Sequence, residues 1–271
     1  MLGQRIITAI VLLSALLLIV FFTNALFFSL FLTLVTLMGV WEWSRLADIR
    51  SIFGRSLYCF AFLIICAWVY ISLADSIVVV LNISVLFWLL AFFLVCTYPR
   101  YNNYWKKLSV LSLMGFLVLI PCWIVMLHIR SQDDFEFNFL SLIVLVAAAD
   151  VGAYFFGRKF GKHKLAPLVS PNKTWEGVLG GIAACFLIAI IIFGLKRFLQ
   201  EEPINGFLLV ILPLLVSSFS VVGDLFESML KRVQGLKDSG NILPGHGGIL
   251  DRIDGIVSAT PIYMLLLLYF N

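Results

Sequence analysis

Long apolar stretches recur along almost the whole chain and constrain its fold more than any other feature. An α-helix needs roughly 20 apolar residues to cross the hydrocarbon core of a bilayer, which is about 30 Å thick. The chain is 62% hydrophobic and 13% charged, whereas a soluble globular protein is roughly 45–50% apolar and about 25% charged. About nine stretches are candidate membrane spans, at residues 6–22, 25–43, 57–74, 76–97, 108–127, 139–157, 177–195, 206–223 and 249–270.

The uninterrupted character of these stretches predicts helices, because a transmembrane barrel would show alternating strands of about ten residues. The expected fold class is therefore an all-α integral membrane protein, a polytopic helical bundle. Residues 1–137 are predicted to form the N-terminal transmembrane helices, and the aromatic and basic residues of "VWEWSRLADIR" and "YPRYNNYWKK" are predicted as interfacial anchors. Residues 138–271 form a second region that holds most of the unusual polar groups.

Basic residues predict the orientation, because cytoplasmic loops of membrane proteins carry an excess of Lys and Arg. With the N-terminus in the cytoplasm, all but three of the 19 Lys and Arg residues fall on the cytoplasmic side, the exceptions being Arg130, Lys196 and Arg197. The net charge of +4 therefore reflects membrane orientation and gives no reason to expect nucleic acid as a partner. All cysteines lie inside apolar stretches without the spacing of metal ligands, which argues against disulfides and zinc.

Two apolar stretches contain or end in a carboxylate. Asp150 lies roughly 10 Å from the predicted inner end of its helix. A charge at that depth costs about 2.5–3.5 kcal/mol or more, so a functional role is the default expectation. Asp224 ends the stretch 206–223, and Glu227, Ser228 and Lys231 follow it on the same helical face. An amphipathic helix at the membrane surface would explain that face equally well.

Asp251 and Asp254 precede an apolar stretch that is too short to cross the membrane unless its helix begins near Ile249. The segment "DRID" is therefore predicted to form the first turns of the last helix. Three segments distant in sequence thus bring carboxylates to the inner membrane face. Carboxylates that gather in a low dielectric usually share a cation, and oxygen ligands without cysteine or a histidine cluster favour Mg²⁺.

Groups able to bind phosphate are predicted on the same face. "SPNKTWEG", residues 170–177, has the pattern of a helix start, with Thr174 as a candidate cap and Glu176 in the first turn. "PGHGG" precedes the last helix, where glycines allow a phosphate to approach free N–H groups, and its His246 is a candidate phosphate donor or acid–base group. The basic loop "GRKFGKHK", residues 157–164, is more simply explained as cytoplasmic positive charge.

Two motifs match a known family. "SMLKRVQGLKDSGNILPGHGGILDRID", residues 228–254, resembles the signature of the phosphatidate cytidylyltransferase (CDP-diacylglycerol synthase) family. "DVGAYFFGRKFGKHKLAPLVSPNKTWEG", residues 150–177, is similar to that family's second motif. The resemblance is close over about residues 140–270. The N-terminal half resembles the family only in having several apolar helices. No serine-hydrolase, zinc-protease or Walker A pattern competes with it.

The resemblance implies transfer of the cytidylyl group of CTP to phosphatidic acid, which gives CDP-diacylglycerol and pyrophosphate in phospholipid biosynthesis. It implies a catalytic region at residues 138–271 whose active site faces the cytoplasm from the cell (inner) membrane. It also implies Mg²⁺, a second, monovalent cation and a homodimer. Metal binding would fall to Asp224 and Asp251, with Asp254 in support.

The candidate site residues form three groups. The resemblance implies catalytic roles for Asp224, Asp251, Lys231, Arg232, His246 and Arg252. The residues expected to bind substrate phosphates are Lys173, Ser170, Thr174, Lys237, Gly247 and Gly248. Further polar candidates are Asp150, Tyr154, Glu176, Glu227, Ser228 and Asp238.

Two other functions are compatible with parts of the pattern. A CTP-dependent lipid kinase would need the same metal and cations but would transfer the γ-phosphate, and only the signature separates the two enzymes. An ion-coupled transporter would need acidic groups near the midplane with access from both sides, whereas the polar residues here lie toward one face.

Overall fold

The computed structural model of the chain is an all-α bundle with one small hairpin, and it describes residues 2–72, 76–200, 205–242 and 247–270. Within these residues, eight helices are long and apolar enough to cross a membrane. They are α2 (Ala25–Leu46), α3 (Ile52–Ser72), α4 (Ile77–Thr97), α6 (Leu108–Arg130), α7 (Phe135–Phe160), α8 (Trp175–Gln200), α9 (Gly206–Val233) and α10 (Leu250–Phe270). The protein is therefore a polytopic helical membrane protein, as the apolar stretches predict.

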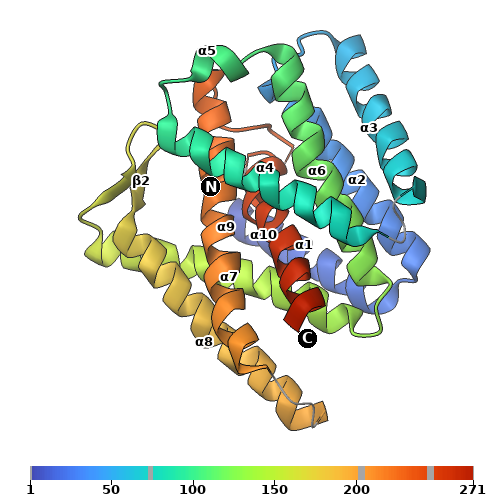
Figure 1. Cartoon of the computed structure of the whole chain (residues 1–271), viewed down its shortest axis with the longest axis vertical. Helices are drawn as coiled ribbons and strands as arrows, with labels where there is room; N and C mark the ends of the chain where they lie inside the picture. Colours follow the sequence, from blue (N-terminus) through green and yellow to red (C-terminus); the bar gives the residue numbers. More distant parts are fainter. Residues whose placement is uncertain (1, 73–75, 201–204, 243–246, 271) are drawn as a thin grey trace.

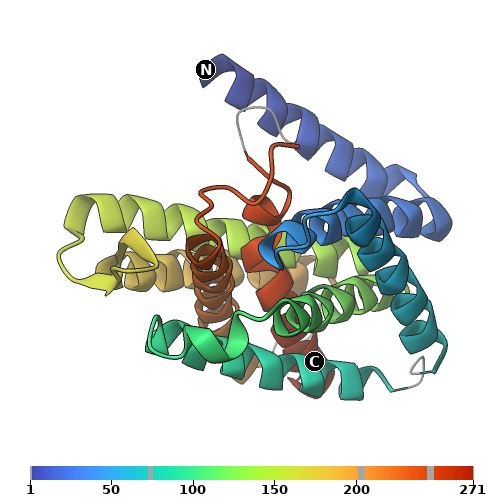
Figure 2. The same ribbon diagram turned by 90° about the horizontal axis from the view of Figure 1, so that it is seen from above.

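The remaining helices are α1 (Leu2–Phe22) and the single turn α5 (Asn102–Trp105). α1 corresponds to the first predicted span, and its residues Ile10–Phe22 form an apolar helix. Figure 2 shows α1 extending away from the bundle at the N-terminal end, where it is followed by α2.

Three predicted boundaries matter for the site. α9 does not end at residue 223 but continues to Val233, so that Asp224 and Lys231 lie inside one continuous helix. α7 likewise continues to Phe160, which places Asp150 deeper in its helix than the sequence indicates. α10 begins at Leu250, and the prediction that "DRID" forms its first turns is confirmed.

Two helix pairs form the C-terminal part of the bundle: α7 packs along α8, and α9 packs along α10 (Figure 1). Glycines allow the first pair to approach closely. A Cβ added at Gly152 would collide with the backbone of Gly180, and one added at Gly180 would collide with the ring of Phe156. Small residues at a helix interface give membrane helices this close contact, because lipid supplies little hydrophobic drive for association.

The N-terminal helices α2, α4 and α6 pack against α9 and α10 on another side. A cluster of aromatic rings, Trp43, Phe87, Trp88 and Phe226, fills part of this interface. Trp43 is only 2% exposed, and its indole donates a hydrogen bond to the carbonyl of Leu111. The prediction that Trp43 anchors at the lipid interface is therefore wrong, because this ring packs inside the protein.

A two-stranded antiparallel hairpin connects α7 to α8 and lies at the edge of the molecule (Figure 1). Its strands are β1 (Lys164–Ala166) and β2 (Ser170–Thr174), with Lys164 opposite Thr174. The guanidinium of Arg232 donates to the carbonyl of Val169 and ties the hairpin to the end of α9. The hairpin therefore holds Lys173 in a fixed place relative to α9.

Candidate active site

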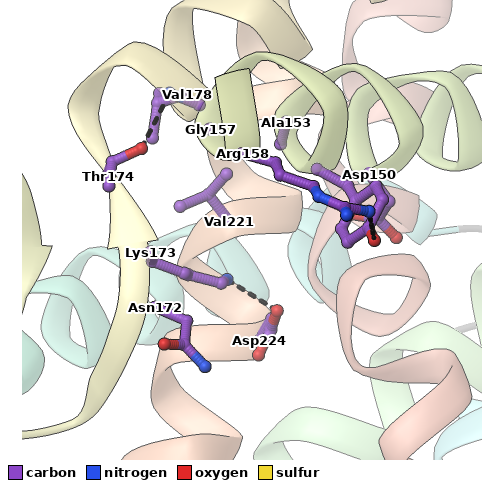
Figure 3. A pocket seen from close by; sticks show the side chains of 12 residues that line it. Asp150, Ala153, Gly157, Arg158, Asn172, Lys173, Thr174, Val178, Val221 and Asp224 are labelled. Carbon is purple, nitrogen blue, oxygen red and sulfur yellow. Dashed lines mark hydrogen bonds and ion pairs between the residues drawn. The ribbon is translucent and has the colours of Figure 1, made fainter. Parts of the chain in front are cut away.

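A cavity lies between α7, α8, α9 and strand β2. Its volume is about 520 Å³, and Figure 3 shows its side chains. Its lining consists of Asp150, Ala153, Tyr154, Gly157, Arg158, Asn172, Lys173, Thr174, Gly177, Val178, Val221 and Asp224. Five predicted site residues therefore share one cavity: Asp150, Tyr154, Lys173 and Thr174 from the segment 150–177, and Asp224 from α9.

An ion pair crosses this cavity. The ammonium of Lys173 lies 2.6 Å from Oδ2 of Asp224, and Asn172 lies beside the pair (Figure 3). The carboxylate of Asp150 is close enough to interact electrostatically with both partners. The cavity thus holds two carboxylates, one amide and one ammonium, which is a set suited to phosphate groups and a hard cation.

Two polar lining residues were not predicted from the sequence. The guanidinium of Arg158 contacts the hydroxyl of Tyr154 at 3.1 Å at the side of the cavity. Arg158 belongs to the basic loop, whose charge was explained by membrane orientation alone. An asparagine in this sequence context does not by itself indicate a site residue. Only the position of Asn172 next to Lys173 on the hairpin could have suggested that it lines the cavity.

A second polar cluster lies where α9 meets the start of α10. The ammonium of Lys231 lies 2.6 Å from Oδ1 of Asp251. Oδ2 of Asp251 accepts hydrogen bonds from the backbone N–H groups of Ser239 and Gly248, at 3.0 and 2.8 Å. Lys231 also contacts Glu227 at 3.1 Å. The cluster therefore joins four predicted residues: Glu227 and Lys231 on α9, Gly248 before α10, and Asp251 on α10.

The polar residues that the sequence predicts on one face of α9 do lie on one face. This face is largely buried, so it is not the water-exposed side of a surface helix. Ser228 hydrogen-bonds to Asp224 one turn earlier, while Glu227 and Lys231 are 3% and 7% exposed. Asp254 interacts electrostatically with Asp224 and Glu227, so the two clusters are continuous. Within the described residues, no three Asp, Glu, His or Cys side chains are arranged so that they alone could hold a metal ion.

Several predicted residues make contacts that hold the local structure. Oγ1 of Thr174 accepts from the N–H of Gly177, so Thr174 caps α8 as its pattern predicts. The Glu176 carboxylate accepts from the N–H groups of Lys162 and His163 and closes the turn after α7. Arg232 binds the backbone of the hairpin.

The remaining predicted residues are exposed, lie in the hairpin or in the segment before α10, or lie outside the described residues. Lys237, Asp238 and Arg252 are exposed, and Ser170 begins strand β2. Gly247 has a positive φ of 85° and packs against Asp251 and Asp238. His246 lies outside the described residues.

Comparison with known proteins gives one consistent result. Residues 3–270 match the model of the cytidylyltransferase family. The chain is 44% identical to a phosphatidate cytidylyltransferase of Pseudomonas aeruginosa over 98% of this chain and 97% of that protein. It is 39% identical to a phosphatidate cytidylyltransferase of Haemophilus influenzae over 97% of each chain, and 38% identical to one of Bacillus subtilis over 67% of this chain and 68% of that protein.

Proposed function

Since this chain belongs to the cytidylyltransferase family and transfers the cytidylyl group of CTP to phosphatidic acid, we propose that the transfer takes place in the cavity between α7, α8 and α9. The products are CDP-diacylglycerol and pyrophosphate. The lipid kinase and the ion-coupled transporter that parts of the sequence pattern allow are not favoured, because the curated relatives carry the name of the cytidylyl transfer enzyme.

The observation that carries this location is the ion pair between Lys173 and Asp224, with Asp150 beside it. Both substrates and both products are phosphate esters or anhydrides, so the site must neutralise several negative charges. Lys173 and Arg158 supply positive charge at the cavity. The carboxylates Asp150 and Asp224 would repel phosphate unless a cation lies between them.

The chemistry requires no general base. A phosphomonoester has a second pKa of about 6, so phosphatidic acid is mostly dianionic at neutral pH. One of its phosphate oxygens attacks the α-phosphorus of CTP, a new P–O bond forms, and the bond from that phosphorus to the bridging oxygen breaks as pyrophosphate leaves. Catalysis then consists of positioning and of stabilising charge on the transferred group and on pyrophosphate.

The residues of the cavity fit Mg²⁺. It prefers oxygen ligands and keeps one or two protein carboxylates while water and substrate phosphates complete its shell. Asp224 and Asp150 are such carboxylates. The ammonium of Lys173 lies beside Asp224, so this position favours a positive charge. When bound, Mg²⁺ would neutralise triphosphate oxygens. The expectation that Asp251 and Asp254 share this role stays a prediction, because Asp251 already accepts from Lys231, Ser239 and Gly248.

The second cluster lies beside the cavity, and we assign it to the triphosphate or the departing pyrophosphate. Lys231 and the exposed Arg252 supply positive charge there, and Lys237 lies on the loop that follows α9.

The proposed site faces the cytoplasm from the inner membrane, where CTP and a membrane lipid can both arrive. The contacts of the helix ends agree with the predicted division of residues between the two membrane sides. Lys196 pairs with Asp134, and both are predicted outside. Lys173 pairs with Asp224, and both are predicted inside. A homodimer, a second monovalent cation and the division into residues 1–137 and 138–271 stay predictions.

Label transfer tests the reaction directly. The purified protein in detergent micelles receives phosphatidic acid, Mg²⁺ and CTP labelled at either the α- or the γ-phosphate. We expect α-label in the extracted lipid together with release of pyrophosphate. γ-Label in the lipid would identify a kinase, and no label in the lipid from folded protein would overturn the proposed function.

A further inference from the structure

A carboxylate from the N-terminal half of the chain lies beneath the start of α10. Glu42, on α2, is 2% exposed. Its Oε1 accepts from the N–H of Ile249 at 3.0 Å, and its Oε2 accepts from the N–H of Leu250 at 2.9 Å and from the hydroxyl of Ser239 at 3.0 Å. One side chain therefore binds the segment that joins α9 to α10 at Ser239 and again at the start of α10.

The physical reason for a carboxylate here is the free N–H groups of the helix start. The first turn of a helix leaves its N–H groups without intrahelical acceptors, and they carry partial positive charge. A side chain of the helix itself usually caps them. In α10 this partner comes from α2, and the bonds to an ionised acceptor are stronger than neutral ones.

Two glycines of the signature segment are explained by this contact. A Cβ added at Gly240 would collide with the carboxylate of Glu42, and one added at Gly248 would collide with Glu42 and with the hydroxyl of Ser239. The backbone must approach the carboxylate this closely for its N–H groups to reach it. Arg45, one turn after Glu42, donates to the carbonyl of Ser239 at 3.4 Å and holds the same residue from its other side.

Ser239 connects Glu42 to the site. Its hydroxyl lies within hydrogen-bond distance of Oε2 of Glu42 and, at 3.1 Å, of Oδ2 of Asp251. The same Oδ2 accepts from the N–H groups of Ser239 and Gly248. The single hydroxyl proton of Ser239 lies between the two carboxylates. The N–H groups that hold Oδ2 of Asp251 belong to Ser239, which Glu42 contacts directly, and to Gly248, whose neighbour Ile249 donates to Glu42.

We propose that Glu42 is a positioning residue for cytidylyl transfer, which holds Ser239 and the first turn of α10 so that the Asp251 carboxylate and its partner Lys231 keep their place beside the cavity. Glu42 touches no substrate in this proposal and acts through Ser239. The inference rests on the proposed function, because it needs Asp251 to take part in turnover.

The test measures kcat and KM for CTP with Glu42→Gln, Ser239→Ala and the double variant. Gln keeps the size of the side chain but turns one acceptor into a donor that faces other donors. We expect each single variant to lower kcat about tenfold, the worth of one charge-assisted hydrogen bond, with little change in KM. The kcat of the double variant should also fall about tenfold rather than about a hundredfold, because both substitutions break the same contact between Glu42 and Ser239.

Glu136→Gln is the matched control, because it makes the same chemical change in the first turn of α7, on the opposite side of the membrane in the predicted topology. It should keep full activity.

Wild-type kcat in folded Glu42→Gln, or independent effects that multiply in the double variant, would overturn the inference. If Glu42→Gln does not fold, an unchanged kcat in Ser239→Ala overturns it. Asp251→Asn is measured in parallel: full activity in that variant would instead refute the assignment of Asp251, and hence the proposed function of this cluster.

Discussion

The ammonium of Lys173 on β2 and the carboxylate of Asp224 on α9 lie 2.6 Å apart across the cavity. Their side chains are 24% and 37% exposed, and ion pairs with this access to water contribute only about 0–1 kcal/mol to stability. The pair is therefore poorly explained as a device for holding the fold. A cation and a carboxylate that meet at a polar cavity are better explained by the charged substrates that enter it.

Replacing Lys173 by Gln should lower kcat/KM for cytidylyl transfer about a hundredfold, because the variant loses one fixed positive charge beside the transferred phosphate. Its melting temperature in detergent should stay close to that of the wild type. Lys106→Gln, in an exposed loop on the same membrane side, is the control and should keep full activity. Similar losses in both variants would show that the effect comes from general surface charge and not from the cavity.

Replacing Asp251 by Asn should abolish turnover. The amide would leave Lys231 without its partner charge and would present N–H donors to those of Ser239 and Gly248. Breaking a buried pair in this way costs about 3–5 kcal/mol, so the melting temperature should also fall. Size-exclusion chromatography shows whether the variant is folded at the assay temperature. Activity near that of the wild type would refute the role of Asp251.

Removing divalent metal with a chelator should abolish transfer, and Mg²⁺ should restore it. Asp224→Asn should raise the Mg²⁺ concentration that gives half-maximal rate, because the metal would lose a charged ligand. Binding of Mn²⁺, followed by electron paramagnetic resonance without substrates, should weaken in parallel. Unchanged Mn²⁺ binding in Asp224→Asn would exclude this carboxylate as a ligand.

Arg232 is predicted from the sequence as a catalytic residue, but it binds the carbonyl of Val169 in the hairpin. Arg232→Gln should therefore loosen the strand that carries Lys173. We expect faster hydrogen–deuterium exchange in residues 164–174 and a loss of activity of about tenfold, as for one hydrogen bond to a charged group. A loss of activity with unchanged exchange in the hairpin would instead favour a direct contact of Arg232 with substrate.

The sequence was sufficient to predict what depends on local spacing. Apolar length predicts the spans, the shortness of the last stretch predicts that Asp251 begins α10, and the i, i+4 spacing predicts that Ser228 meets Asp224. The Thr174 cap follows from a pattern of the same local kind.

Contacts between distant helices could not be predicted in this way. Periodicity tells which face of a helix is polar, but not which other helix covers it. Glu42 stands near the end of an apolar stretch among aromatic and basic residues that resemble interfacial anchors, and nothing in its neighbourhood indicates Leu250 as its partner. Asn172 enters the site because the hairpin folds back over α9, and Arg158 enters it because α7 continues beyond the predicted end of its span.

The orientation of the site in the membrane can be tested with single cysteines in a variant that lacks the five native ones. Lys106→Cys, between α5 and α6, is predicted in the cytoplasm, and Ser131→Cys, after α6, is predicted outside. A membrane-impermeant maleimide should label Ser131→Cys in intact spheroplasts and Lys106→Cys only in inverted vesicles, because the reagent cannot cross the apolar core. α6 joins these positions and is one of the membrane-spanning helices, so both outcomes must change together. Labelling of Lys106→Cys in intact spheroplasts would place the cavity on the outer face, where CTP is absent, and would contradict the proposed site.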